Sequence, residues 1–387
     1  MYDHNGASPD LDVVVIGGGV IGLAVAWRAA QAGLRVTVLE RRRLGSETSY
    51  VAAGMLAPIS EASLAERGVL ALGLRAAATY QAFVAELADA SGTDPGYLSC
   101  GTLAVARDAD EAEALEREFE MRCALGLEVT RLLPSAARRM EPALAPALRL
   151  ALEVPGDHAI DPRRLTAALA EAVECAGGVL RTGAEVVEVA CDGDRIAGVV
   201  LACGERLPAQ QLVVAAGPWS GHLAGLPPFA QMPIRPVKGQ ILRLHDPSGP
   251  GLVGHVLRMG GGYIVPRGDG RYVLGATMEE RGFDRSVTAG AAFALLREAI
   301  ELVPGFSELE VDELSAGLRP ATPDGVPAIG PGAVSGLHWA TGHHRGGILL
   351  APLTAELVVS GLLGEEPVAE AASVAPARFA AAEARAR

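Results

Sequence analysis

The chain has 387 residues, half of them hydrophobic, and carries a formal net charge of −13. Its length allows a large buried core and suggests about two to three domains. Because proteins that bind nucleic acid normally present a basic surface, the acidic balance argues against that class of function.

The cysteine pattern and the first residues favour a cytoplasmic protein. The cysteines form neither a Cys-x-x-Cys pair nor a metal-binding cluster with histidine, and their odd number and wide spacing are typical of a reducing compartment. They are Cys100, Cys123, Cys175, Cys191 and Cys203. The first ten residues are polar and acidic, unlike a signal peptide, and no uninterrupted apolar run reaches the roughly 18 residues of a membrane span. We therefore expect no metal, no membrane partner and no nucleic-acid partner.

Residues 11–22 predict the phosphate turn of a dinucleotide-binding unit. Residues 11–16 are a short apolar run rich in β-branched side chains, which indicates a buried parallel strand. Gly17, Gly19 and Gly22 follow with the spacing G-x-G-x-x-G. The first glycine permits a tight turn, the second lets the backbone approach a pyrophosphate, and the third lets a helix pack close to the strand.

The residues after this turn complete the unit. Residues 20–32 are typical of an apolar helix that ends at Gly33, and residues 36–39 are typical of a second strand. The helix directs free N–H groups and its positive dipole end toward the phosphates. Glu40 follows the second strand, where an acid accepts hydrogen bonds from ribose hydroxyls. A glycine turn in another kind of α/β protein is the alternative, but the strand, helix and acid at these distances favour a dinucleotide site.

Nucleotide-type α/β segments recur in the middle and at the end of the chain, and antiparallel β structure with helices fills the gaps. This pattern predicts two domains, each assembled from discontinuous pieces. The alanine-rich tail after Glu370 is expected to be a frayed helix or disordered. We expect helices over residues 61–90, 108–125, 161–177, 289–302 and from about 348, and strands over residues 101–107, 185–190, 196–201, 211–216, 311–319 and 338–341.

Four groups of residues together resemble a known family. They are the glycine fingerprint, SYVAAGMLAP at 49–58, VVAAGPWS at 213–220, and the pair AGLRPATPDGVPAIGP at 316–331 and ATGHHRGGILLAP at 340–352. In this order and spacing they resemble the FAD-dependent D-amino-acid oxidase superfamily over nearly the whole chain. Within it, the last two segments are most similar to glycine oxidases of thiamine biosynthesis, which make iminoglycine for the thiazole ring.

The resemblance implies an α/β fold, α+β overall. A glutathione-reductase-like FAD-binding Rossmann domain would carry a second, antiparallel β-sheet domain that binds the substrate. The FAD-binding domain is expected to comprise residues 1–92, 152–226 and 320–370. The substrate-binding domain is expected to comprise residues 93–151 and 227–319, and residues 371–387 would be a C-terminal tail.

The resemblance also places a non-covalently bound FAD along residues that are small, carry a short hydroxyl or expose backbone N–H groups. Small residues let the backbone lie flat along the isoalloxazine, and the helix after the second glycine-rich turn can stabilise negative charge near N1 and O2 of the flavin. Taken singly, each residue could instead be a turn or packing residue. The implied set is Gly17, Gly19, Val20, Ile21 and Gly22 at the pyrophosphate, Glu40 and Arg41 at the ribose, Thr48 and Ser49 at the diphosphate or ribityl chain, Ala53, Gly54 and Met55 at the flavin, Val186 at the adenine, Gly217, and His343, His344, Arg345, Gly346, Gly347, Ile348 and Leu349 at the helix start.

An amino-acid substrate brings a carboxylate, which a planar bidentate donor binds best. Arg319 follows the apolar residues of an expected strand, and by resemblance it is the carboxylate clamp. Arg345 resembles a second arginine on the substrate side, and Tyr263 resembles the tyrosine that lines the amine pocket. Met278 is expected to line the same pocket. The alternatives are a structural ion pair for Arg319, an ordinary strand aromatic for Tyr263 and core packing for Met278.

The sequence departs from the family pattern at two positions. Gly261 lies two residues before Tyr263, where glycine oxidases carry a histidine, and this leaves the amine preference open. Gly317 lies in the region where the related sarcosine oxidases tether the flavin through a cysteine, so we expect FAD to be bound non-covalently. Lys238, the only lysine of the chain, is interpreted as a lysine at a strand end and not as a catalytic group.

The resemblance implies an oxidase for small amino acids. Glycine, and with it sarcosine or small D-amino acids, would transfer hydride from Cα to flavin N5, and oxygen would then regenerate the cofactor and form hydrogen peroxide. The resemblance also implies a homotetramer and a hand-off of the imine to a thiazole synthase. Three alternatives stay open: a D-amino-acid dehydrogenase that passes electrons to a quinone, a tRNA-modifying flavoenzyme, and a non-catalytic nucleotide sensor. The net charge of −13 and the missing methyltransferase half argue against the tRNA enzyme.

Overall fold

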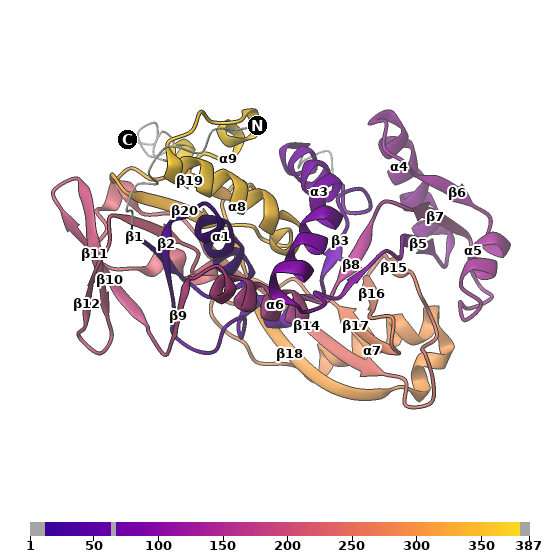
Figure 1. The fold of residues 1–387 in the computed structure, drawn as a ribbon. Helices are drawn as coiled ribbons and strands as arrows, with labels where there is room; N and C mark the ends of the chain where they lie inside the picture. Colours follow the sequence, from indigo (N-terminus) through magenta and orange to yellow (C-terminus); the bar gives the residue numbers. More distant parts are fainter. Residues whose placement is uncertain (1–11, 63–66, 380–387) are drawn as a thin grey trace.

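A six-stranded sheet forms the centre of the first domain (Figure 1). The computed structural model describes residues 12–62 and 67–379. In order across the sheet the strands are β19 (Ala328–Pro331), β20 (Leu337–Thr341), β13 (Gln211–Val214), β1 (Asp12–Ile16), β2 (Arg35–Glu40) and β9 (Val179–Thr182). All neighbours are parallel except β19 and β20, so the carboxyl ends of the parallel strands meet at one edge.

This sheet is the middle layer of three, because successive side chains of a strand point to opposite faces. On β1, Val13 and Val15 face the core formed with helices, whereas Val14 and Ile16 face the opposite core. The helical layer consists of α1 (Val20–Gln31), α3 (Arg67–Ser91), α6 (Pro162–Cys175) and α8 (Gly347–Leu363). The other layer is an antiparallel sheet of β10 (Val186–Asp192), β11 (Arg195–Leu201) and β12 (Arg206–Pro208).

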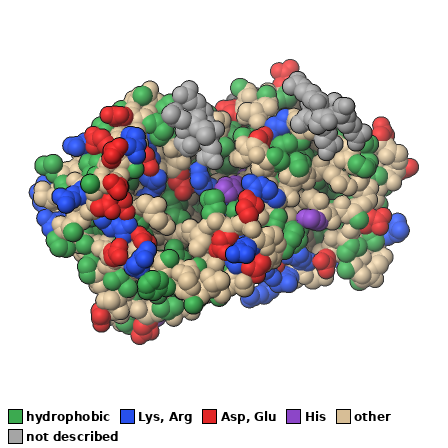
Figure 2. All heavy atoms as spheres, turned by 180° about the vertical axis from the view of Figure 1, so that it is seen from behind, with side chains coloured by type: hydrophobic (Ala, Val, Ile, Leu, Met, Phe, Trp, Pro, Cys, Tyr) green, Lys and Arg blue, Asp and Glu red, His purple; other side chains and the backbone are tan. Residues whose placement is uncertain are grey.

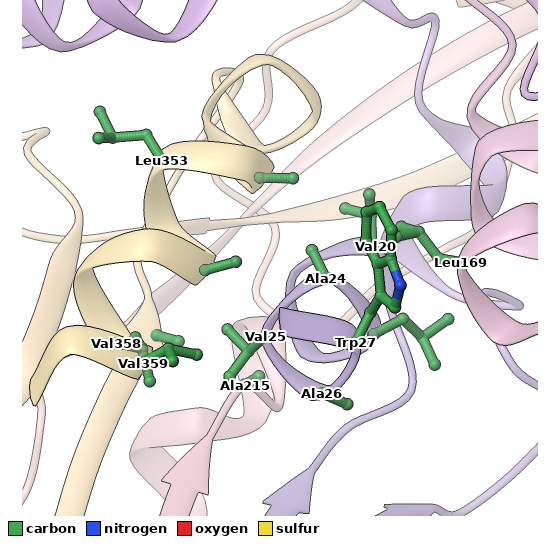
Figure 3. Close-up of a cluster of buried hydrophobic side chains, with 14 of the residues drawn as sticks. Val20, Ala24, Val25, Ala26, Trp27, Leu169, Ala215, Leu353, Val358 and Val359 are labelled. Carbon is green, nitrogen blue, oxygen red and sulfur yellow. The ribbon is translucent and has the colours of Figure 1, made fainter. Parts of the chain in front are cut away.

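Helix α1 is enclosed by the other helices of its layer. Figure 3 shows that Val25 of α1 faces α8 near Val358, and that Trp27 of α1 lies beside Leu169 of α6. Trp27 is 1% exposed and meets the ring of Phe83 edge-on, with ring centroids 5.5 Å apart. Helices α6 and α8 pack on α1, and α3 contacts it through Phe83 and Glu86, so the position of the α1 N-terminus at the sheet edge is fixed.

The second domain is built on a curved eight-stranded sheet. Its strands, in order, are β18 (Glu310–Ala321), β14 (Arg235–His245), β17 (Arg271–Gly275), β16 (Gly262–Pro266), β15 (Val256–Met259), β5 (Thr102–Ala106), β7 (Leu150–Val154) and β6 (Thr130–Leu132). Only β15 and β5 pair in parallel among these strands. Helix α7 (Ala289–Leu302) packs on it through Leu295, Ala299 and Leu302. Helices α4 (Ala109–Ala124) and α5 (Pro134–Met140) lie at the β5–β7–β6 end.

Shorter elements connect the two domains. Strands β3 (Met55–Leu56), β8 (His158–Ile160) and β4 (Tyr97–Leu98) form a small sheet, and α2 (Thr48–Val51) lies against β18. The expected α/β fold with a second, antiparallel β-sheet domain is confirmed. The boundaries expected at 151/152 and 319/320 fall inside β7 and β18, and both strands belong whole to the eight-stranded sheet.

Two expectations about helices change at their ends. The helix expected over 61–90 begins at Arg67, since residues 58–61 form a turn and residues 63–66 lie outside the described ones. The tail expected to be frayed includes α9 (Ala369–Val374), where Val374 is fully buried. Arg378 pairs with Asp324 at 2.7 Å, so residues 371–379 dock on the first domain. Residues 380–387 of the expected tail lie outside the described part.

One helix among the described residues is long and apolar enough to cross a membrane by length and composition, at Gly68–Ser91 of α3. One face of this helix is buried against α6 and α8 through Leu72, Ala76, Tyr80 and Leu87. Such a face is typical of an amphipathic core helix, and a single helix of this kind is weak evidence for a membrane span. On the face that Figure 2 shows, acidic and basic side chains are interspersed.

Stability should depend on pH through the buried His338. Burial lowers the pKa of His338 to about 4, and its Nε2 lies 3.2 Å from Gln211 Oε1. The unfolded chain binds the proton near pH 6.5, so this contribution to stability is complete above that pH and is lost as the pH falls toward 4. We expect the loss of unfolding free energy between pH 7.5 and 5.5 to be about 1.3 kcal/mol smaller in His338→Gln than in the wild type. Urea denaturation at both pH values measures it, and equal losses would contradict this account.

Candidate functional site

A cavity of about 670 Å³ lies between the two domains, at the carboxyl ends of the parallel strands. This size is typical of pockets that bury most of a drug-sized ligand. The β1–α1 turn, the end of β2 and the turn before α8 line it from the first domain, and β14, β16 and β18 line it from the second. Open α/β sheets bind ligands at this edge, so the cavity is the candidate site.

The structure brings nearly all of the expected site residues together around this cavity. Those that line it are Gly17, Gly19, Val20, Ile21, Glu40, Arg41, Thr48, Ser49, Ala53, Gly54, Met55, Val186, Gly217, Tyr263, Met278, Arg319, His343, His344, Arg345, Gly347 and Ile348. Gly22, Gly346 and Leu349 do not line it. They belong to the same two turns but pack behind the lining residues, because a helix presents only part of its first turn to one side.

The glycine turn forms a cradle that larger residues would fill. Gly17 has a φ of +108°, and a Cβ there would lie 2.5 Å from Ala215 O. A Cβ at Gly22 would overlap the carbonyl oxygen of Gly17, so this glycine lets α1 sit directly on the turn. A Cβ at Gly19 would meet only Ser49 Oγ, at 3.2 Å, which leaves open space in front of the helix N-terminus. This geometry fits a pyrophosphate.

Ser49 and Glu40 hold the cradle from the side. Val20 N–H donates to Ser49 Oγ at 3.0 Å, and a serine hydroxyl that accepts one hydrogen bond can still donate another. Glu40 is 8% exposed and accepts from the N–H groups of Gly18 at 2.8 Å and Arg42 at 2.9 Å. Each carboxylate oxygen has a second lone pair, so Glu40 can also accept from a ribose hydroxyl.

Arg41 stacks on an aromatic ring that sequence reasoning did not single out. Its guanidinium lies 3.8 Å from the centroid of the Trp219 ring and pairs with Glu47 at 3.0 Å. Phe283 stacks on Trp219 with centroids 5.8 Å apart, and Arg285 pairs with Glu47. The segment after β17 therefore crosses from the second domain to the end of the cavity at Glu40 and Arg41.

Residues 48–55 form a side wall of the cavity, which we call the wall, between the Glu40 end and the Arg319 end. Thr48 was expected to reach the diphosphate or the ribityl chain, and in the structure its hydroxyl donates to Leu318 O at 2.7 Å and ties α2 to β18. Gly54 has a φ of +81°, and a Cβ there would overlap Ile160 O. Gly317 lies against Val51, since a Cβ at Gly317 would be 2.9 Å from the Cβ of Val51. The wall is thus packed against Ile160 at Gly54 and against Gly317 at Val51.

Helix α8 points its N-terminus at the cavity without a side-chain cap. His344 takes the left-handed conformation with a φ of +48°, and its N–H donates to Pro320 O at 2.7 Å. Burial lowers the pKa of His343 to about 3 and that of His344 to about 4, the latter also because Arg319 and Arg345 are near. Both imidazoles are therefore neutral at pH 7, and the positive potential here comes from the helix end and the arginines.

Arg319 and Tyr263 meet at the other end of the cavity. Arg319 pairs with Val237 across β14 and β18, and its guanidinium leans onto the diagonal neighbour Gly239. A Cβ at Gly239 would lie 2.6 Å from Arg319 Cζ. Nη1 donates to Thr277 O at 3.1 Å, and a guanidinium has five N–H donors in all. Burial raises the pKa of Tyr263, although the nearby Arg319 charge opposes the shift.

Five further residues line this end of the cavity. Arg345 Nε lies 3.7 Å from Glu61 Oε2, so the second expected arginine faces an acid that sequence reasoning missed. Met278 is 61% exposed at the border of the cavity. A Cβ at Gly261 would make only ordinary contact with Glu298, at 3.5 Å, and Glu298 is not among the residues that line the cavity. Arg258 also lines the cavity and pairs with Glu118 at 2.6 Å.

Asp157 and Arg122 form a buried clamp that fixes the backbone of residues 59 and 60, just before Glu61. Asp157 accepts from the N–H groups of Ile59 at 3.1 Å and Ser60 at 2.6 Å. Arg122 donates to the carbonyl oxygens of the same two residues, at 2.9 and 2.6 Å. Burial raises the pKa of Asp157 to about 6. No local pattern indicates this clamp, because its members are far apart in the sequence.

Lys238 takes no direct part in the cavity. It was interpreted as a lysine at a strand end, but it lies within β14 and is 1% exposed. Its Nζ pairs with Asp284 at 2.7 Å, and this partner holds the pKa of Asp284 well below its usual range. Lys238 therefore anchors the segment that carries Met278, Phe283 and Arg285.

The comparisons with known proteins agree with this arrangement. The family described as FAD dependent oxidoreductase matches residues 12–360. The glycine oxidase of Geobacillus kaustophilus is 37% identical over 350 residues, which cover 90% of this chain and 91% of that protein. The bifunctional protein ThiO/ThiG of Trichormus variabilis is 34% identical, over 92% of this chain and 53% of that protein. The crystal structure of the Geobacillus kaustophilus glycine oxidase matches with a TM-score of 0.87 at 35% identity, over 95% of this chain and 98% of that one. The chain belongs to the FAD-dependent oxidoreductase family.

Proposed function

We propose that this protein catalyses the FAD-dependent oxidative deamination of glycine and of sarcosine or small D-amino acids. The observation that carries the proposal is the guanidinium of Arg319, held on Gly239 beside Tyr263, in the same cavity as the dinucleotide cradle. A bidentate cation at that place suits the carboxylate that every amino acid carries. The relatives named glycine oxidase support glycine as the first substrate to test.

The residues around the cavity suit FAD. The glycine turn and α1 would hold the pyrophosphate, Glu40 and Arg41 the ribose, Val186 the adenine, and residues 53–55 with the α8 N-terminus the flavin ring. Among the described residues that line the cavity there is no cysteine, which supports non-covalent binding. The cofactor, when bound, supplies the acceptor for the hydride that leaves the substrate Cα.

The side chains of this protein would act mainly by positioning. Arg319 binds and orients the substrate carboxylate, and Tyr263 and Met278 border the space around the amine. The helix end of α8 and Arg345 offer positive potential where negative charge develops. No carboxylate pair or Ser-His-Asp set is needed for such a transfer, because orientation of the reacting atoms supplies much of the rate. With glycine as the substrate and oxygen as the final electron acceptor, the expected products are the imine, which hydrolyses to glyoxylate and ammonia, and hydrogen peroxide.

The fused relatives suggest a fate for the imine. In the bifunctional protein ThiO/ThiG the part similar to this chain is about half of the protein. We infer that the imine passes to a thiazole synthase, in the cytoplasm, for thiamine biosynthesis. A homotetramer remains part of the proposal.

An anaerobic spectrum tests the reaction and its acceptor. Glycine added to the FAD-loaded protein without oxygen should bleach the yellow flavin absorbance, and air should restore it with release of hydrogen peroxide. Recovery with a quinone but not with air would instead identify the alternative, a D-amino-acid dehydrogenase. A spectrum that glycine leaves unchanged would contradict glycine as the substrate, and sarcosine and D-alanine would then be tried.

Removal of the carboxylate clamp should weaken substrate binding. Arg319→Ala is expected to raise the KM for glycine about tenfold to a hundredfold, because charge-assisted hydrogen bonds contribute about 1.5–3 kcal/mol. Arg319→Lys should recover part of this loss, since it restores the charge but not the fork. Steady-state kinetics with the exposed Arg131→Ala as control measure both. An unchanged KM in Arg319→Ala would exclude Arg319 as the group that binds the substrate carboxylate.

Displacement of the same guanidinium should have a similar effect without loss of its charge. In Gly239→Ala the added methyl group would press on Arg319 Cζ, and the flexible side chain must move. We expect the KM for glycine to rise about tenfold, while FAD binding and thermal stability change little. Gly290→Ala is the matched control, because a Cβ there meets nothing within 4 Å. A normal KM in Gly239→Ala would show that the glycine does not set the position of Arg319.

A further inference from the structure

Three arginines outside the cavity hold carbonyl groups of residues 50–53, which are part of the wall. We call Arg163 of α6, Arg243 of β14 and Arg267, which follows β16, the arginine layer. None of the three lines the cavity, whereas Val51, Ala52 and Ala53 do. The layer therefore stands behind the wall and does not touch a bound ligand.

Each arginine donates to a carbonyl oxygen of this wall. Arg243 Nη2 donates to Tyr50 O at 2.9 Å, and Arg163 Nε donates to the same oxygen at 3.2 Å. Arg267 Nη2 donates to Ala53 O at 2.7 Å. These bonds turn the carbonyl dipoles away from the cavity.

The layer also carries a surplus of positive charge. The neighbouring carboxylates are Glu313, 2.7 Å from Arg163, and Asp161, 3.9 Å from Arg267. Three cations face two anions, which leaves one net positive charge. The Nε atoms of Arg243 and Arg267 are buried and have no hydrogen-bond partner among the described residues. Burial lowers the pKa of both side chains to about 10, so both stay charged at pH 7.

We propose that the arginine layer raises the reduction potential of the FAD that binds against residues 51–55, and fixes the wall on which the flavin ring lies. This inference rests on the proposed FAD site. Reduction adds electrons to the bound group, and a buried positive charge nearby favours the state with more electrons because little solvent screens it. The three arginines are positioning residues.

Removal of a positive charge from the arginine layer and removal of the neighbouring Glu313 charge should move the reduction potential of FAD in opposite directions. In the FAD-loaded protein, Arg163→Gln and Arg267→Gln should lower the ratio of reduced to oxidised FAD roughly fivefold at a fixed potential, whereas Glu313→Gln should raise it. Anaerobic reduction in equilibrium with a redox dye measures the ratio without any amine substrate. Arg131→Gln, an exposed arginine of β6 paired with Glu116, is the matched control and should leave the ratio unchanged.

The affinity for FAD separates the charge from the geometry. Fluorescence titration of the apoprotein with FAD should show weaker binding in Arg267→Gln, since Ala53 O loses its donor, and recovery in Arg267→Lys. Unchanged ratios in Arg163→Gln and Glu313→Gln, or shifts of the same sign in both, would overturn the proposal. Arg163 is partly exposed, so it remains testable if Arg267→Gln does not fold. A protein that binds FAD, shows these shifts and yet is not reduced by any amine would contradict the proposed function and leave the arginine layer supported.

Discussion

The site depends on the contact between α2 and β18, where the two domains meet. Thr48 donates to Leu318 O, and Val51 packs on Gly317, the residue two positions before Arg319. This contact places the wall of residues 48–55 and Arg319 in one cavity. Each domain alone would offer half of a site, the glycine cradle on one side and the strand that carries Arg319 on the other. The position of Arg319 relative to the cradle is therefore a property of the junction.

Local patterns in the sequence predicted most of the fold. The strand before Gly17, the helix after it and the α6 start at Asp161-Pro162 were correct, because apolar periodicity, glycine turns and caps act over a few residues. The α7 bounds also agreed with the sequence prediction. The start of α3 and the docking of residues 371–379 were not predicted. Tertiary contacts such as that of Arg378 with Asp324 decide the latter, and such contacts leave no local pattern.

The sequence predicted which residues belong to the candidate site better than it predicted the contacts that these residues make. The resemblance named Arg319 and Tyr263, but only strand pairing reveals that Gly239 makes room for the guanidinium and that Gly275 lies directly opposite Tyr263. The hydroxyl of Thr48 was assigned to the cofactor, and in the structure it donates to the other domain. Glu61 was missed because its position depends on the distant Arg122 and Asp157. The acidic chain also places Arg319 and Arg345 in the cavity, which overall charge does not predict.

The single lysine gives the protein an unusual chemical surface. Lys238 is the only side-chain amine of the chain, and it is buried under the segment that Asp284 belongs to. Apart from the α-amino group, the folded protein therefore offers no accessible amine to acylating reagents or to lysine-directed cross-linkers. Acylation of Lys238 requires the segment after β17 to lift from β14. Its rate of modification is thus an intrinsic reporter of how often that segment leaves the end of the cavity at Glu40 and Arg41.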